Sequence, residues 1–543
     1  MAKSHKILPS ISLSVSLLMF IPILALIYQA FFIADGNDHT FDNILDSVLW
    51  QYIKNSLLVV ATTLIFACLF AIAPAWWCAR YEFKGRRFLQ WAMVFPLAIP
   101  AYVSAYIYTK ALDYPGPVQT SLRQWFDWQS PNDYWFFDMR SITGGSLMLA
   151  LALYPYIYLL LRYGFAKQSD HLDHAARLLG ASSRQVFFKI RLAMARPALA
   201  IGCTLVAMEA LADFGTMHLF AISTLTTAIY DSWLVYGSLS TAAKLSCLLL
   251  IFIVTLSLLE RRQRKAQKQY ESRGQQLLQR KTISAKKAIG IWLACGSVLL
   301  LGFMIPVAYL LDFTFTYLQQ NWQPQLLQHS LHTFLLAAVA ATICMVIAMM
   351  LNAQLRLRPT RFNQTQLSIA SLGYAIPGTV LAIAVLIPLG ALDVAIHDVM
   401  TWANMDSLGL IFSGTSVALL FAFVLRFLAI ANGSIHSGYQ QISPNLDLAA
   451  ASLGQSHGGV FRFIHFPLIR PMALSAFLLV FIECVKELPA AILLRPFDFE
   501  TLSTYVYQHA SDDQLEHGAL AALLIIIVSL LPIILLSRTQ RMS

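Results

Sequence analysis

The chain has 543 residues, of which 58% are hydrophobic and 12% are charged, and its mean hydropathy is +0.62. This composition excludes an ordinary water-soluble globular protein and predicts a chain that is surrounded by lipid. The formal net charge of +10 is also found in nucleic-acid-binding proteins. Here the positive residues cluster in short loops between apolar stretches, so we expect no nucleic-acid partner.

Twelve apolar stretches are long enough to cross a bilayer, because a spanning helix needs about 20 residues. A helix is expected because lipid offers no hydrogen bonds, so the backbone N–H and C=O groups must bond to one another. We therefore predict an all-α membrane protein with twelve transmembrane helices. The first stretch is too long for a secretory signal, so we expect a retained anchor. The prolines Pro100 and Pro377 interrupt the third and ninth spans, where we expect kinks. The predicted spans are 7–33, 56–79, 88–112, 143–165, 197–220, 241–259, 288–316, 330–351, 366–392, 409–431, 471–495 and 517–536.

The distribution of charge predicts the orientation. With the amino terminus in the cytoplasm, most of the 38 Lys and Arg residues fall in cytoplasmic segments, while acidic residues such as Asp35, Asp38 and Asp512 lie in the opposite loops. Basic residues on the cytoplasmic side are the usual pattern of membrane proteins. We therefore expect a multi-pass protein of the bacterial inner membrane with both termini in the cytoplasm.

The sequence is internally duplicated on either side of a polar linker. Residues 172–197 align without gaps to residues 446–471, and the basic segment 260–287 between them is the expected cytoplasmic linker. It separates residues 1–259 from residues 288–543, each with six predicted spans. Two tandem six-helix domains of equal orientation are expected to be related by a pseudo-two-fold axis along the membrane normal. At the same spacing, Asn55 and Ser56 pair with His329 and Ser330, and Glu209 pairs with Glu483.

Each duplicated segment predicts a short amphipathic helix that ends in a tight turn. Apolar residues recur at helical spacing, an aspartate lies near the amino end of each helix, and a glycine follows its last turn. Serines precede both helices as expected N-caps, and a capping box opens the next helix of the first copy. The residues are Ser169, Leu172, Asp173, Ala175, Ala176, Leu179, Gly180, Ser182 and Gln185, and in the second copy Ser443, Leu446, Asp447, Ala449, Ala450, Leu453 and Gly454.

These two segments resemble the EAA loop of permeases from binding-protein-dependent ABC importers. The glycine of each copy is followed by a matching tail: Phe187, Ile190 and Pro197 in the first copy, and Phe461, Ile464, Pro467 and Pro471 in the second. His174 and Leu448 replace the leading glutamate of the family, and Ala193 replaces the first proline of the tail.

The resemblance implies that residues 169–197 and 443–471 are coupling loops, each docked on one of two copies of an ABC ATPase subunit. The ATPase-coupling residues that it implies are Asp173, Ala175, Ala176, Gly180, Phe187, Pro197, Asp447, Ala449, Ala450, Gly454, Phe461, Pro467 and Pro471.

The sequence contains no Gly-x-x-x-x-Gly-Lys phosphate-binding loop, so we expect ATP and Mg²⁺ to be bound by a partner chain. It also lacks serine-elbow and His-Glu-x-x-His motifs. We therefore predict a non-catalytic transmembrane subunit with no cofactor of its own and no firmly assigned metal site.

The segments 210–216 and 486–508 and the fused twelve-span layout resemble the ferric-iron permease family. This resemblance implies ferric iron as the substrate and an extracytoplasmic iron-binding protein as a partner. Related fused permeases carry thiamine, and half-size relatives carry sulfate, molybdate and polyamines, so another small solute stays an alternative. A secondary transporter of the facilitator type also has twelve spans, and residues 85–87 resemble its loop motif in three positions.

Four acidic residues are candidates for the substrate pathway. Glu209 and Asp213 are four residues apart in the fifth span, and Glu483 and Glu487 are similarly placed in the eleventh, so each pair is expected on one helix face. An acid at the membrane centre costs about 2.5–3.5 kcal/mol, so such residues face protein or a water-filled cavity. Either they attract a hard cation into the pathway, or they are structural, with Lys486 neutralising one of them.

Overall fold

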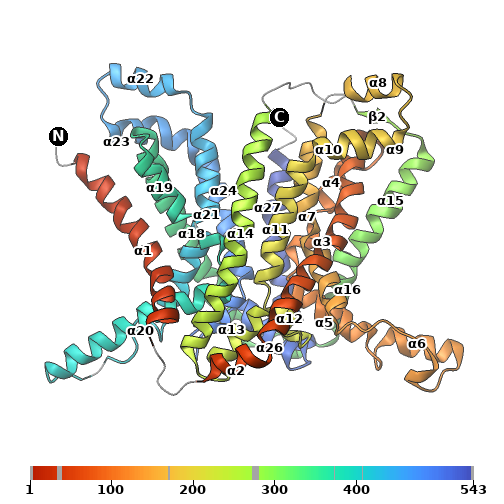
Figure 1. Ribbon diagram of the computed structural model, residues 1–543, viewed down its shortest axis with the longest axis horizontal. Coiled ribbons are helices and arrows are strands. Elements are labelled where there is room, and N and C mark those ends of the chain that lie inside the picture. The colour runs from red at the N-terminus through yellow and green to blue at the C-terminus, as the bar shows by residue number, and fades with distance from the viewer. Residues whose placement is uncertain are drawn as a thin grey trace. The chain divides into compact units, whose positions relative to one another are not determined.

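The computed structural model describes residues 4–33, 39–168, 171–271, 280–371, 373–406 and 408–539. Most of these residues are helical, and their only sheet is a two-stranded parallel pair of β1 (Tyr81–Glu82) and β2 (Lys281–Thr282). The chain divides into two compact units, each built from three separate segments. Unit 1 comprises Met1–Ile44, Ala228–Leu250 and Trp322–Val506, and unit 2 comprises Leu45–Thr227, Ile251–Asn321 and Tyr507–Ser543. Figure 1 shows the helices of each unit with their labels.

Unit 1 contains the second copy of the duplicated segment. Its long helices α18, α21 and α24 pack on one another, and α1 covers α19 and α20. The elements are α1 (Ser4–Phe32), α18 (Pro324–Leu357), α19 (Arg361–Ala370), η5 (Gly373–Ala375), α20 (Gly378–Trp402), α21 (Ser416–Gln441), α22 (Pro444–Ser452), α23 (His457–Val460), η6 (Phe461–His465), α24 (Phe466–Lys486) and α25 (Pro489–Leu494).

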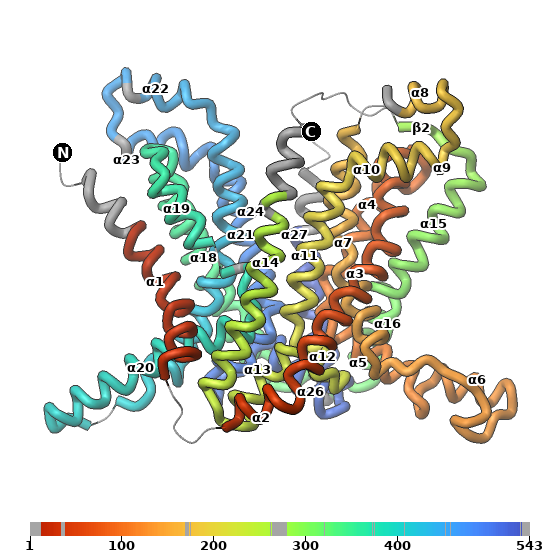
Figure 2. The backbone as a smooth tube through the Cα atoms, viewed as in Figure 1, coloured from red at the N-terminus to blue at the C-terminus, as the bar shows by residue number. Residues whose placement is uncertain are grey.

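Unit 2 contains the first copy. Its centre is formed by α3, α7 and α11, as the tube in Figure 2 makes easy to follow. The elements are α3 (Leu49–Arg80), β1, α4 (Arg86–Ala92), η1 (Phe95–Ala98), α5 (Ala101–Leu112), α6 (Pro117–Phe126), η2 (Pro131–Asp133), α7 (Ile142–Ala166), α8 (His171–Leu178), α9 (Ser183–Gln185), η3 (Val186–Arg191), α10 (Leu192–Met194), α11 (Arg196–Ala212), α12 (Gly215–Leu219), β2, α15 (Ala285–Leu299), η4 (Leu300–Met304), α16 (Ile305–Thr316), α17 (Leu318–Asn321), η7 (Leu515–His517) and α27 (Ala519–Thr539).

Four further helices begin in one unit and end in the other. They are α2 (Thr40–Ser47), α13 (Leu225–Leu234), α14 (Leu239–Glu271) and α26 (Leu502–Ser511).

Each unit includes peripheral helices that lie, in sequence, on the other side of the predicted linker. The first helix of the sequence, α1, packs on the helices that carry the second repeat, whereas α15 and α16 pack against α3, α4 and α5 of the first repeat. The last helix, α27, also belongs to unit 2, where it packs on α16. Each compact unit therefore needs segments from both sides of the predicted linker, although the repeat itself follows the chain order.

Small residues allow the central helices of each unit to approach closely. In unit 2, Ala67, Ala71 and Ala75 of α3 are fully buried, and they belong to one core cluster with Tyr154 and Tyr158 of α7. In unit 1, α18 is similarly lined with buried alanines between α21 and α24. Such surfaces are typical of helix packing in lipid, where van der Waals contact replaces the hydrophobic effect as the driving force.

The described residues contain nine helices that are long and apolar enough to span a membrane, or up to eleven if each bent pair counts as one span. Pro100 does not kink a continuous helix as predicted but stands as the N-cap of α5. The pieces on either side of this break are bent by 88°. Pro377 is likewise the N-cap of α20. The twelfth predicted span corresponds to α27, whose apolar part is the shorter segment Ala519–Pro532.

The described residues at the end of the predicted linker pack against unit 2. The helix α14 continues through Glu271, and after the undescribed residues 272–279 the chain pairs with β1. Arg280 forms an ion pair with Glu82 (Nη1 to Oε2, 3.7 Å). The indole of Trp292 donates to the Lys84 carbonyl (3.0 Å). The end of the linker is thereby attached to the loop between α3 and α4.

Candidate functional site

The two duplicated loops have the predicted helix and turn. The helix α8 is followed by Gly180 with φ of +83°, and α22 is followed by Gly454 with φ of +72°. In both copies the next residue donates its N–H back into the helix, from Ala181 to Ala176 (3.0 Å) and from Gln455 to Ala450 (3.1 Å). This is the left-handed closure that glycine adopts without a steric penalty.

The helix caps also follow the sequence pattern. Ser182 and Gln185 form the reciprocal capping box (Gln185 N to Ser182 Oγ 3.3 Å, Ser182 N to Gln185 Oε1 2.8 Å). Ser443 accepts from the N–H of Asn445 (3.3 Å) and stands directly before α22. The predicted cap Ser169 lies outside the described residues. Beyond each turn the chain forms one π-helical segment, η3 and η6, so the two copies agree in backbone as well as in sequence.

Each loop exposes large apolar side chains. Leu178 and Leu179 are 88% and 89% exposed, and Leu448 and Leu453 are 66% and 81% exposed. Ala175 and Ala449 are exposed as well, whereas Ala450 is buried and Ala176 is half-buried. Clustered exposed leucines beside small residues are typical of a surface that a partner covers. The side chain of Leu172 is not described.

Asp173 turns away from this surface into its own unit. One carboxylate oxygen accepts from Nε of Arg191 (2.5 Å), and the other accepts from Nη2 of Arg80 at the end of α3 (3.4 Å). All three side chains are at most 4% exposed. Both guanidinium groups lie beside the ring of Trp76, at 5.9 and 5.8 Å from its centroid. The aspartate thus attaches α8 to α3 and η3 by buried ion pairs.

Asp447 makes the corresponding contacts in unit 1. It accepts from Nε of Arg356 at the end of α18 (2.7 Å) and contacts Nε2 of His465 (2.8 Å). The His465 ring also packs edge-on against Tyr439. Burial raises the pKa of Asp447, but the hydrogen bonds from His465 and Arg356 outweigh this effect and hold the pKa below its ordinary value.

The remaining predicted loop residues connect each loop to the following span. The ring of Phe187 packs edge-on against Trp76 (5.4 Å between centroids). Pro197 and Pro467 lie in the first turns of α11 and α24, where a missing N–H is tolerated. Phe461 opens η6, and Pro471 lies inside α24.

The acidic pairs do not share a continuous helix face as predicted. The helix α11 ends at Ala212 and α24 ends at Lys486, so Asp213 and Glu487 are the C-cap residues with extended backbone angles. The Asp213 carboxylate accepts from the N–H groups of Thr216 (3.0 Å) and Met217 (3.2 Å). A short acidic side chain that bonds the next backbone amides competes with helix continuation, and it starts the new helix α12.

Glu487 is held by different partners. It accepts from Nη1 of Arg426 on α21 (3.1 Å) and from the N–H of Ala490 (3.1 Å). A Cβ on Gly378, the first residue of α20, would overlap both the Arg426 guanidinium and the Glu487 carboxylate. Glycine at this position therefore lets the ion pair lie against the start of α20.

Glu209 and Glu483 are half-buried on the last turns of α11 and α24. Glu483 accepts from Nζ of Lys486 (3.1 Å), so the structure contains the neutralising contact that the structural interpretation requires. Among the described residues, no group of three or more His, Cys, Asp or Glu could hold a metal ion.

A threonine-rich turn follows each broken helix and fixes the register of the repeat. Thr226 donates to the Asp213 carbonyl (2.8 Å), and Ser503 donates to the Glu487 carbonyl (2.6 Å). The neighbouring amides bond to the second helix of each repeat, because Ser56 accepts from Leu225 N–H (3.0 Å) as Thr333 accepts from Leu502 N–H (2.7 Å).

The predicted pairing of Ser56 with Ser330 is therefore wrong by three residues. The structural counterpart of Ser56 is Thr333. The chain between the second helix of the repeat and the coupling loop differs in length by three residues between the two copies. The ungapped alignment of the coupling loops therefore does not extend back to that helix.

The cationic partners of the loop aspartates were not predicted. Arg191 and His465 occupy matching positions in the aligned segments 172–197 and 446–471, so a basic or imidazole side chain at the same place in both copies was the signal available. Arg80 and Arg356 come from distant helices, and nothing in the local sequence connects them to the loops.

Two broken-helix repeats with paired amphipathic loops define a helical membrane permease with duplicated halves. Comparison with known proteins identifies its kind. Residues 69–267 match the family of the binding-protein-dependent transport system inner membrane component. The matched segment thus carries the domain of an ABC transporter permease of the inner membrane. The family implies a substrate-binding protein and an ATPase as partners.

The chain is similar over most of its length to permease proteins of ferric transport systems. It is 26% identical to the Fe(3+)-transport system permease protein FbpB 2 of Haemophilus influenzae over 90% of both chains. It is 24% identical to the ferric transport system permease protein FbpB of Actinobacillus pleuropneumoniae, over 98% of this chain and 78% of that protein. The molybdenum transport system permease protein ModB of Escherichia coli is 29% identical over 40% of this chain and 93% of its own length.

Proposed function

We propose that this chain is the non-catalytic permease subunit of an ATP-driven importer that carries ferric iron across the inner membrane. The observation that supports this best is the similarity to two ferric-iron permeases along nearly the whole chain. Substrate delivery is assigned to an extracytoplasmic iron-binding protein, and ATP with Mg²⁺ is assigned to two copies of an ABC ATPase. Both termini lie in the cytoplasm in this proposal.

The coupling loops receive the motion of the ATPases. The exposed leucines of α8 and α22 are the docking surfaces, and the ion pairs of Asp173 and Asp447 attach each docked helix to the end of a long helix, α3 or α18. An ATPase that displaces the loop thereby displaces the helix bundle. A ligand or partner shifts a conformational equilibrium only through such differential contacts.

The four acids are proposed to serve the pathway at the breaks of α11 and α24. Interrupted helices near the membrane centre are typical of transporter binding sites. The carboxylates of Asp213 and Glu487 are already bonded to backbone amides, so they shape the break. Glu209 and Glu483, one helical turn earlier, are the residues proposed to attract a hard cation.

Uptake measurements test the substrate. A strain that lacks this gene is supplied with radiolabelled ferric iron or with radiolabelled thiamine, with and without the gene restored. Restoration of iron uptake alone supports the proposal, and restoration of thiamine uptake alone would replace iron by the alternative solute.

Co-purification of an ATPase and inhibition of uptake distinguish an ATP-driven importer from a secondary transporter. The importer requires co-purification of a nucleotide-hydrolysing subunit and vanadate-sensitive uptake. Uptake that survives vanadate but collapses with a protonophore would instead identify a secondary transporter.

A further inference from the structure

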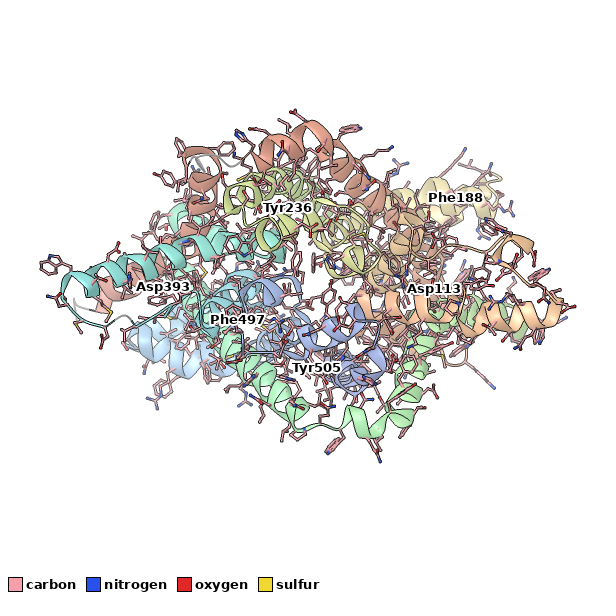
Figure 3. The ribbon with its side chains drawn as sticks, turned by 90° about the horizontal axis from the view of Figure 1, so that it is seen from below. Asp113, Phe188, Tyr236, Asp393, Phe497 and Tyr505 are labelled. Atoms are coloured by element: carbon pink, nitrogen blue, oxygen red, sulfur yellow. The ribbon has the colours of Figure 1, made fainter. Side chains whose placement is uncertain are left out.

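An arm of unit 2 projects from the bundle between α5 and α7. Its base is closed by an ion pair between Asp113 and Arg140 (3.4 Å). The amide of Gln119 on α6 donates to the carbonyl of Leu112, the last residue of α5 (2.6 Å). Figure 3 shows Asp113 where the arm leaves the bundle, and Figure 1 shows α6 extending sideways at the end of the unit away from α8. The arm is therefore held at a fixed place beside the spans.

The arm is rigid because its aromatic rings stack on one another. Phe126 stacks on Trp128 (4.8 Å between centroids, 19° between planes), and Trp128 stacks on Tyr134 (4.6 Å, 11°). A capping box between Ser130 and Asp133 closes the turn between them. The arm nevertheless leaves Trp125 82% exposed and Trp135 85% exposed. Two indoles without cover on an ordered arm indicate an environment other than water.

The apolar side of α6 forms an open groove with a membrane-spanning helix. Val118, Leu122 and Trp125 recur at helical spacing on one face. With Pro117 and Ser121 they line a pocket that is completed by Tyr309 of α16. The helix α16 belongs to the candidate span Ala285–Thr316. The groove therefore lies between an amphipathic helix and the flank of a span.

The span that contributes Tyr309 also exposes large apolar side chains. On α16, Leu311 is 42% exposed and Phe315 is 73% exposed, and in a membrane-spanning helix such side chains face hydrocarbon. Tryptophan and tyrosine are enriched where hydrocarbon meets headgroups, and an amphipathic helix lies in that plane with its apolar face toward the acyl chains.

We propose that the groove formed by α6 and Tyr309 binds an acyl chain of a membrane phospholipid, with Trp125 at the level of the headgroups. The proposal does not depend on the transported substrate. It makes the arm a lipid anchor at one end of unit 2. The competing occupant, a soluble binding protein, would have to cover the same indole from the aqueous side.

Unit 1 has an arm at the corresponding place in its repeat. The helix α20 continues beyond Pro388, and the following loop is tied back because Asp393 accepts from the N–H groups of Phe412 (2.9 Å) and Ser413 (2.7 Å). At its tip, Trp402 is 87% exposed. The sequences of the two arms differ, but both have an exposed tryptophan on a segment that side-chain contacts hold in place.

Lipid-borne quenchers test the proposal in the complete transporter. The complex of permease and ATPase is reconstituted in vesicles of phosphatidylcholine brominated on its acyl chains, and tryptophan fluorescence is compared between the wild type and Trp125→Phe. We expect the fluorescence lost on substitution to be the fraction quenched by bromolipid and spared by aqueous iodide. Quenching of that fraction by iodide alone would overturn the proposal, and so would shielding from iodide only after the soluble binding protein is added.

A second pair of variants tests the groove without its indole. Leu122→Glu places a charge in the groove, whereas Gln124→Glu places the same charge on an exposed position of the same helix. Phospholipid that stays bound through purification is counted by native mass spectrometry. We expect a loss of bound lipid in Leu122→Glu only, with normal ATPase association in both. Equal lipid retention in the two variants would contradict the proposal.

Discussion

Arg191 and His465 occupy the same position in the two coupling loops, and each binds the aspartate that lies 18 residues before it. The first copy therefore holds its aspartate between two guanidinium groups, Arg80 and Arg191. The second copy holds it between a guanidinium and an imidazole, Arg356 and His465. The same attachment is made with a guanidinium in the first copy and with an imidazole in the second.

Asp173→Asn is expected to be more damaging than Asp447→Asn. The Asp173 side chain is 4% exposed and its replacement removes the shared carboxylate of two buried ion pairs, whereas Asp447 is 27% exposed. Breaking a buried ion pair from one side costs about 3–5 kcal/mol. Thermal unfolding of the purified complex measures the difference. Equal melting temperatures of the two variants would contradict the burial argument.

Exchange of the cations tests whether the two attachments are interchangeable. Arg191→His leaves Asp173 with Arg80 and an imidazole, which is the arrangement of the second copy. We expect this variant to retain more iron uptake per assembled complex than Arg191→Leu. Because an imidazole changes charge near neutral pH, uptake by Arg191→His should vary more than uptake by the wild type over a pH range of about 6 to 8. A ratio of variant uptake to wild-type uptake that does not change over this pH range would contradict the prediction.

The acid stability of the second loop follows from Asp447. Its pKa in the folded protein is lowered, so this carboxylate stabilises the fold above its unfolded pKa of about 3.9, and the stabilisation is lost as pH falls through the folded pKa. The melting temperature of the wild type should exceed that of Asp447→Asn while the carboxylate is ionised, and the difference should shrink in acid. A melting-temperature difference that increases as the pH falls would contradict a lowered pKa of Asp447.

Much of the loop was predictable from the sequence because its signals are local. The glycine closures, the Ser182 capping box and the start of α22 depend on residues within one or two turns, and all are present in the structure. The ion pairs of Asp173 and Asp447 were not predictable, because they join the loop to helices far away in the chain. The prediction that each acidic pair shares one helix face was wrong for a related reason. Periodicity places Asp213 on a helix, but its hydrogen bonds to the next backbone amides end that helix.

The glycines Gly180 and Gly378 should respond differently to replacement by alanine. Around Gly180 no atom of the described residues lies within 4 Å of an added Cβ, so Gly180→Ala costs the left-handed backbone, about 1–2 kcal/mol. At Gly378 the added Cβ would overlap Arg426 and Glu487. We expect Gly378→Ala to lower the melting temperature more than Gly180→Ala, whose effect should instead appear in ATPase docking. The reverse order would contradict the packing at α20.

Neutral replacement of the pathway acids separates attraction of the substrate from structure. Glu483→Gln removes the partner of Lys486 (3.1 Å) and leaves the bonded carboxylate of Glu487 intact. If Glu209 and Glu483 attract a hard cation, the double variant Glu209→Gln and Glu483→Gln should lower iron uptake while the complex assembles and hydrolyses ATP as before. Lys486→Gln is the matched control, because it breaks the same ion pair but keeps the negative charge. Loss of uptake in the control and not in the double variant would assign these residues to structure alone.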